Sequence, residues 1–140
     1  MKPIRLVLVD DSPVFLASAG EMLGQCASVD FAGTASSGAE AIAFVDRAGP
    51  DLVLLDVNMP GMNGLEAARR IKAKNARIRV IMISVNKGKD LERAALAAGA
   101  DAFAAKDDLA GALSRHAQAW FGFDPLATRS ATENPEEVSR

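Results

Sequence analysis

The chain has 140 residues, of which 49% are hydrophobic and 24% charged, and its formal net charge at pH 7 is -2. This length suffices for one domain with a sizeable core, and the mild acidity means that the chain has no basic excess of the kind that tracks a phosphate backbone. We therefore expect one main domain that makes no direct contact with nucleic acid. A single cysteine, Cys26, excludes an internal disulfide and favours a reducing cytoplasm as the location.

The apolar run near the N-terminus, residues 6–9, is too short for a secretion signal because Asp10 interrupts it. No stretch approaches the ~20 apolar residues that a membrane span requires. We therefore expect a soluble protein with no membrane partner.

Five short runs rich in β-branched residues or leucine alternate with longer segments of helical spacing. The predicted strands are Ile4–Val9, Val29–Thr34, Leu52–Leu55, Ile78–Ile83 and Ala102–Ala104. Helix starts are predicted at Ser12, at Ser37 with Glu40 as a capping box, at Asn63, and at Asp107 or Asp108, and helix ends at Gly49 and Gly99. This alternation predicts an α/β doubly wound fold, a five-stranded parallel sheet with helices on both faces. The common strand order is 2-1-3-4-5.

The last helical segment ends near Trp120, and a polar stretch follows it. We place the domain at residues 1–122. Residues 123–140 are predicted to form a C-terminal tail that is largely disordered.

Acidic residues stand at the ends of two strands that this order makes neighbours. Asp10 and Asp11 end the first strand, and Asp56 ends the third. Ligands of open parallel sheets bind at the carboxyl ends of the strands, so the three carboxylates are expected to share one crevice. Their mutual repulsion would protonate some of them unless a cation neutralises it, and oxygen ligands favour Mg²⁺ over zinc. The alternative for Asp11 is a helix-capping role.

Two further polar residues end later strands, Ser84 and Lys106. Both are expected to point into the same crevice. A hydroxyl that donates to a phosphoryl oxygen and an ammonium that offsets its charge are what phosphoryl transfer to a carboxylate requires. The alternatives are a serine that caps the next turn and a solvated surface lysine.

These residues form an ordered set: Asp10-Asp11, the segment Asp56–Gly64 (DVNMPGMNG), Ser84, Phe103 and Lys106. Over roughly residues 2–121 the chain resembles the receiver domain of bacterial two-component response regulators, the CheY-like proteins of the flavodoxin-like fold. The resemblance implies that Asp56 is the phosphoacceptor. It also implies that Asp10, Asp11 and Asp56 bind Mg²⁺ together with the backbone carbonyl of Asn58.

The resemblance further assigns Ser84 as the switch hydroxyl, Lys106 as the phosphate-binding lysine and Phe103 as the switch aromatic. The donor would be a phosphohistidine on a sensor histidine kinase or a histidine phosphotransfer protein. The protein would be a signalling phosphoprotein in the cytoplasm, not an enzyme, and its aspartyl phosphate would later hydrolyse. Two positions depart from the commonest pattern: Asp107 replaces a proline, and Val85 is bulkier than the usual alanine or glycine and would restrict access to the phosphate.

Several outputs fit this reading. The chain would be a stand-alone receiver, a relay intermediate, or the receiver part of a longer regulator, and its output partner is not specified by the sequence. A partner surface on the fourth helix, fifth strand and fifth helix would change on phosphorylation. The last helix would also allow a phosphorylation-dependent homodimer.

Two other classes of protein compete with a receiver. An aspartyl-phosphate hydrolase also uses a strand-end aspartate and Mg²⁺, but its nucleophile usually lies on the first strand in an Asp-x-Asp arrangement. A passive interaction module would leave the acidic site unphosphorylated, although such a module has no need of three unpaired strand-end acids.

Overall fold

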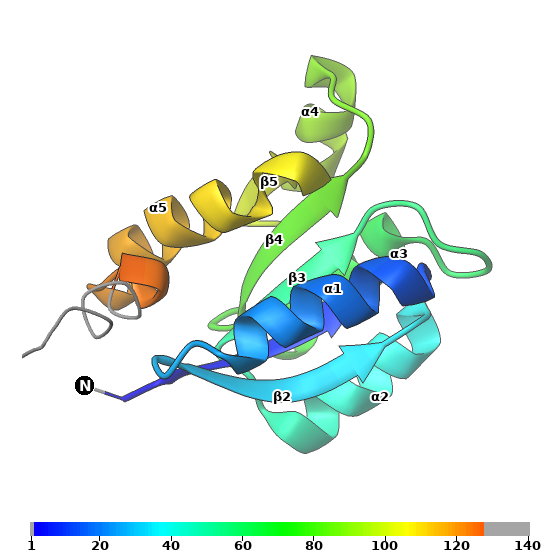
Figure 1. Cartoon of the computed structure of the whole chain (residues 1–140). Helices are drawn as coiled ribbons and strands as arrows, with labels where there is room; N and C mark the ends of the chain where they lie inside the picture. Colours follow the sequence, from blue (N-terminus) through cyan, green and yellow to red (C-terminus); the bar gives the residue numbers. More distant parts are fainter. Residues whose placement is uncertain (1, 128–140) are drawn as a thin grey trace, which may run out of the picture.

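The computed structural model describes residues 2–127 and contains one parallel sheet of five strands (Figure 1). The strands are β1 (Ile4–Val9), β2 (Val29–Ala35), β3 (Leu52–Asp56), β4 (Arg79–Ser84) and β5 (Ala102–Ala105). Their order across the sheet is β2-β1-β3-β4-β5, and every neighbouring pair is parallel. The predicted fold class and strand order are confirmed, and the predicted strand bounds agree within one residue at each end.

Helices cover both faces of the sheet. They are α1 (Pro13–Gly24), α2 (Gly38–Ala48), α3 (Gly64–Lys74), α4 (Lys89–Ala97), the short 3-10 helix η1 (Lys106–Asp108) and α5 (Leu109–Phe121). Buried residues of α1 and α5 pack on one face, and buried residues of α2, α3 and α4 pack on the other. This arrangement follows from the parallel pairing, because each strand must be joined to its neighbour by a crossover.

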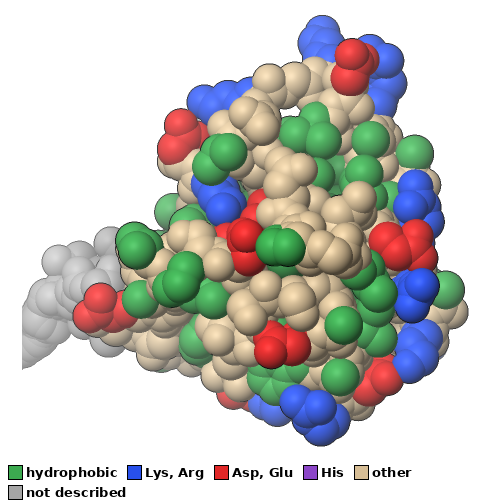
Figure 2. Space-filling view, turned by 90° about the vertical axis from the view of Figure 1, so that its right-hand side faces the viewer, with side chains coloured by type: hydrophobic (Ala, Val, Ile, Leu, Met, Phe, Trp, Pro, Cys, Tyr) green, Lys and Arg blue, Asp and Glu red, His purple; other side chains and the backbone are tan. Residues whose placement is uncertain are grey.

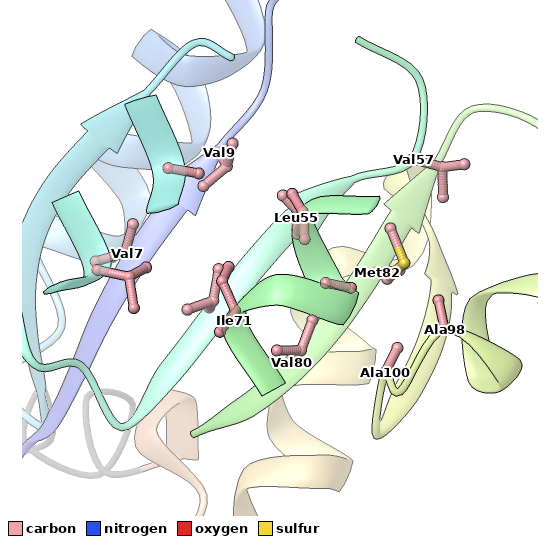
Figure 3. Packing of buried hydrophobic residues seen from close by; sticks show 14 of the residues in the cluster. Val7, Val9, Leu55, Val57, Ile71, Val80, Met82, Ala98 and Ala100 are labelled. Atoms are coloured by element: carbon pink, nitrogen blue, oxygen red, sulfur yellow. The ribbon is translucent and has the colours of Figure 1, made fainter. Parts of the chain in front are cut away.

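The sheet is apolar on both faces because successive side chains of a strand point to opposite sides. In β1, Leu6 and Leu8 join the cluster beneath α1 and α5, whereas Val7 and Val9 join the cluster beneath α2, α3 and α4. Figure 3 shows the second cluster, where Val7 and Val9 lie on the same side of the sheet as Ile71 of α3. The central strands are therefore held from both sides, which fixes the position of their carboxyl ends.

Three of the four predicted helix starts have the expected side-chain cap, and the fourth, at Asp108, does not. The side chains of Ser12, Ser37 and Asn63 each accept a hydrogen bond from a first-turn backbone N–H. Glu40 does not close the predicted capping box with Ser37, because its carboxylate accepts from the backbone and side chain of Ser36 instead. Asp108 occupies the cap position of α5 without a capping hydrogen bond, since its side chain pairs with Arg115.

The chain beyond α5 continues along the domain as far as the structure describes it. Phe123 and Leu126 are partly buried and pack on the cluster beneath α1 and α5. The remainder of the predicted tail, residues 128–140, lies outside the described residues. Among residues 2–127, no helix combines the length and apolar character needed to cross a bilayer.

The close approach of α3 to β3 depends on a glycine. A Cβ atom at Gly64 would lie 2.0 Å from the backbone oxygen of Asp56 and 2.8 Å from the terminal methyl of Met82. The Gly64 N–H also donates to the Val57 carbonyl at 2.8 Å. Any side chain at this position would push the first turn of α3 away from the end of β3.

We expect Gly64→Ala to lower the free energy of unfolding by at least about 2 kcal/mol, because backbone must move to admit the methyl group. Urea denaturation measures the change. The matched control is Gly24→Ala in α1, where an added Cβ meets nothing within 4 Å and is expected to be neutral or to stabilise by up to about 1 kcal/mol. Equal effects of the two substitutions would contradict the packing argument.

Candidate functional site

Three aspartates meet at the carboxyl edge of the sheet. Asp10 directly follows β1, Asp11 comes next, and Asp56 is the last residue of β3, the strand that pairs with β1. Asp10 and Asp56 are buried, with 0% and 4% of their surface exposed, whereas Asp11 is exposed. One carboxylate oxygen from each lies within 4.8 Å of the others. The predicted convergence of these side chains is thus present in the structure.

Figure 2 looks onto this edge of the sheet and shows an acidic patch near the centre of the face, with basic and hydrophobic side chains beside it. Lys106, the first residue of η1, contributes an ammonium to this crevice, and its side chain is only 16% exposed. Its Nζ lies 2.5 Å from Asp10 Oδ2 and 3.8 Å from Asp56 Oδ2. One lysine therefore faces two buried carboxylates and a third at the rim.

The two oxygens of Asp10 have different partners. Oδ1 accepts a hydrogen bond from the backbone N–H of Ser12 at 2.9 Å. Oδ2 is close enough to Lys106 for an ion pair, but the ammonium is not aligned for a hydrogen bond, and no other donor among residues 2–127 reaches this buried oxygen. The Lys106 ammonium is thus its one close partner in this part of the chain, and a bound cation would have to take that place.

The crevice carries more negative than positive charge. Burial first, and then the Asp10 carboxylate, raise the pKa of Asp56 from 3.8 to about 6, although Lys106 and the backbone N–H of Asn58 act in the opposite direction. That N–H lies 3.3 Å from Asp56 Oδ1. A raised carboxyl pKa means that the ionised form is incompletely compensated. The clustered oxygens are thus placed and charged to hold a metal ion.

The remaining predicted residues occupy different parts of this edge. Ser84 ends β4 next to β3 and is fully buried, and its Oγ accepts a hydrogen bond from the Asn86 N–H at 3.0 Å. The serine therefore caps a turn, as its alternative interpretation predicted, while its hydroxyl hydrogen stays available for donation. Asn58 is exposed in the loop after β3, and Val85 is 70% exposed.

Phe103 lies in β5, and its neighbours belong to the hydrophobic core rather than to the acidic cluster. Its ring is partly buried against the cluster beneath α2, α3 and α4. It also lines a surface groove together with Lys87, Glu92 and Arg115. The residue thus connects the interior with the surface formed by α4, β5 and α5.

One contact at the site was not predicted from the sequence. The ring of Phe15 in α1 lies beneath the Lys106 ammonium, with Nζ 4.6 Å from the ring centroid. Phe15 stands in the first segment of helical spacing, and that spacing by itself indicates only an apolar helix face. No sequence signal distinguishes a core phenylalanine from one that contacts a lysine 91 positions later in the printed sequence.

The fold and this crevice define the class of the protein: a doubly wound α/β domain with an acidic, lysine-flanked site at the carboxyl edge of its sheet. The chain belongs to the response regulator receiver domain family, whose model matches residues 6–117. It is thus a receiver domain of the kind found in two-component response regulators, a family of signalling proteins. Receiver domains of this family interact with kinases or phosphotransfer partners.

Relatives of known name agree with this assignment. The nitrate/nitrite response regulator NarL of Escherichia coli K12 is 34% identical over 106 residues, which are 76% of this chain and 49% of NarL. A protein-glutamate methylesterase/protein-glutamine glutaminase of Nocardioides is 34% identical over 82% of this chain and 32% of its own. The chain therefore spans half or less of the length of these relatives.

Solved structures match the fold closely. The signal receiver domain of the response regulator NarL from Mycobacterium tuberculosis superimposes with a TM-score of 0.72 at 34% identity, covering 76% of this chain and 86% of that one. The response regulator domain of CheB from Thermotoga maritima gives a TM-score of 0.67 at 33% identity, covering 73% and 77%.

The charge balance of the crevice predicts a pH-dependent stability. Because the folded-state pKa of Asp56 lies above its unfolded value, the stability linked to this carboxyl is complete below about pH 4 and is lost as pH rises through about 6. In metal-free buffer at about pH 7.5, we expect Asp56→Asn to be more stable than wild type, with a free energy of unfolding that is higher by up to about 3 kcal/mol. Near pH 4 the difference is expected to shrink toward zero.

Urea denaturation at the two pH values measures this effect. The control is Asp90→Asn, because the Asp90 side chain is 97% exposed and pairs with Arg93 in the next turn of α4. A gain from Asp56→Asn that is the same at both pH values would show that the effect does not come from ionisation.

Proposed function

We propose that this chain is the phosphoacceptor of a two-component phosphorelay and that Asp56 carries the phosphoryl group. The observation that supports this most directly is the position of Asp56, a buried strand-end carboxylate flanked by two other acids and by Lys106. A carboxylate oxygen of Asp56 forms a bond to phosphorus while the phosphorus–nitrogen bond of a phosphohistidine breaks. The histidine nitrogen keeps that electron pair and takes up a proton.

The proposed donor is a sensor histidine kinase or a histidine phosphotransfer protein, and the proposed location is the cytoplasm. Asp10, Asp11, Asp56 and the backbone carbonyl of Asn58 would hold Mg²⁺. The fit rests on the excess negative charge of the crevice, the incompletely satisfied Asp10 Oδ2 and an all-oxygen donor set. When bound, the ion would offset the charge of the phosphoryl oxygens.

The other site residues have proposed roles that follow from their contacts. Lys106 would turn from Asp10 toward a phosphoryl oxygen, a short movement because its Nζ is already 3.8 Å from Asp56 Oδ2. The Ser84 hydroxyl can donate to a phosphoryl oxygen while its own oxygen still accepts from Asn86. Both groups act by position and charge, which is the main requirement of phosphoryl transfer.

Phosphorylation would then be transmitted to the surface formed by α4, β5 and α5. An inward movement of Ser84 would open space that Phe103 enters, because Phe103 is only partly buried and lines the groove on that surface. The output partner and a phosphorylation-dependent homodimer would use this surface. A bias of about 5.5 kcal/mol moves such a two-state equilibrium from 1:99 to 99:1.

We favour a signalling role over an enzymatic one. The methylesterase relative is matched over only 32% of its length, and the match to the receiver model covers residues 6–117 of this chain. A phosphate hydrolase remains the second candidate, since Asp56 and a metal site would also serve that chemistry. Multiple turnover of an organic phosphate, lost in Asp10→Asn, would favour it, whereas a passive module would keep its partner binding in Asp56→Ala.

The acceptor role predicts a covalent product. We expect incubation with Mg²⁺ and acetyl phosphate or phosphoramidate to add one phosphoryl group, a gain of ~80 Da, because Asp56 is the nucleophile. Intact-mass spectrometry measures the gain. Asp56→Asn and omission of Mg²⁺ should abolish it, and Asp90→Asn should leave it intact; an unchanged gain in Asp56→Asn would reject Asp56 as the acceptor.

The switch role predicts a spectral change away from the acceptor. With Mg²⁺ and beryllofluoride as the phosphoryl mimic, we expect the backbone amide signals of Ser84, Phe103 and α4 to shift, because Ser84 and Phe103 move together. Two-dimensional amide NMR measures the shifts. The distant α2–α3 groove at Asp46 and Lys74 serves as an internal reference. Identical spectra at Ser84 and Phe103 would exclude this mechanism.

A further inference from the structure

The Lys106 ammonium has a third contact, with an aromatic ring, that takes no part in the proposed chemistry. Besides its two carboxylate neighbours, Nζ lies 4.6 Å from the centroid of the Phe15 ring. A cation over an aromatic face is attracted to the ring, and the attraction grows as the cation loses water. Lys106 is 16% exposed, so most of its hydration is already removed.

The first turn of α1 joins this ring to Asp10. The backbone N–H of Ser12 donates to Asp10 Oδ1 at 2.9 Å, and the Ser12 Oγ accepts from the backbone N–H of Phe15 at 3.3 Å. The ring itself packs on the cluster beneath α1 and α5. The same cap thus places Asp10 and Phe15, and both contact the Lys106 ammonium.

We infer that Phe15 is a positioning residue that holds the Lys106 ammonium on Asp10 and thereby sets how readily Asp10 is released to a divalent cation. The ring stabilises the arrangement in which Lys106 pairs with Asp10 Oδ2. A ligand that needs this oxygen must compete with that pair, and the competition is stronger while the ring is present. The metal-binding part of this inference rests on the proposed function. The cation–π contact by which Phe15 positions Lys106 does not.

The inference predicts that removing the ring changes two properties: the chemical shift of the Lys106 side chain and the affinity for Mg²⁺. In metal-free protein, the ε-methylene protons of Lys106 should be shifted upfield by the ring, and Phe15→Leu should remove that shift. The same substitution should tighten Mg²⁺ binding, with a dissociation constant about threefold to tenfold lower, because the competing ion pair is weaker. Side-chain NMR measures the first property and titration calorimetry the second.

Matched variants separate this role from general packing. Phe15→Tyr keeps an aromatic face and should restore both wild-type values, and Phe15→Met is a second ring-free variant should Phe15→Leu fold poorly. Phe31→Leu is the control for loss of a ring, because Phe31 packs beside Gly20 in the same cluster. It should change neither the Lys106 protons nor the Mg²⁺ affinity.

The outcomes distinguish failure of this inference from failure of the proposed function. An unchanged Mg²⁺ affinity in both ring-free variants, or a change that Phe31→Leu reproduces, would overturn the inference while leaving the acceptor role intact. A wild-type protein that binds no Mg²⁺ would overturn the metal-binding part along with the proposed metal site. The Lys106 proton shift, measured without metal, would still decide whether Phe15 holds the lysine.

Discussion

The crowding of three carboxylates around a single lysine is the constraint on which the site depends. Asp10 and Asp56 are almost completely buried, and their separation is fixed because β1 and β3 are hydrogen-bonded neighbours. Neither strand can move apart to relieve the repulsion, since both are packed from above and below. Charge must therefore be compensated by a cation, by a proton on Asp56 or by Lys106. This unrelieved charge makes the crevice responsive to ligands.

The hydrophobic framework makes that charge tolerable. Leu52 and Leu54 of β3 pack toward α1 and α5, and Val53 and Leu55 pack toward α2, α3 and α4, so the strand that ends in Asp56 is buried throughout. Burial of one such side chain contributes about 1.5–3 kcal/mol, so the four together exceed the cost of about 3 kcal/mol for keeping a partly compensated carboxylate at the strand end. The same packing brings α3 so close that only glycine fits at position 64.

Sequence patterns predicted the sheet and the acidic cluster because both depend on local or topological rules. Alternating apolar runs set the strands, and the order of a doubly wound sheet then places Asp10, Asp11 and Asp56 at one edge. Contacts that depend on side-chain direction could not be predicted this way. Glu40 reaches Ser36 rather than Ser37, and the Phe15 ring meets Lys106, because rotamers and long-range packing decide each pairing.

The energy of neutralising Asp56 can be compared with the energy that the proposed two-state switch requires. Raising the pKa of Asp56 from 3.8 to about 6 corresponds to about 3 kcal/mol of folding free energy. Neutralising this carboxylate alone can stabilise the protein by no more than this amount. A full population shift needs about 5.5 kcal/mol. Neutralising Asp56 is therefore not enough by itself for such a shift. Under the proposed function, the remainder would come from contacts of a phosphoryl group with Ser84 and Lys106, and Lys106 would make them by leaving Asp10 and the ring of Phe15.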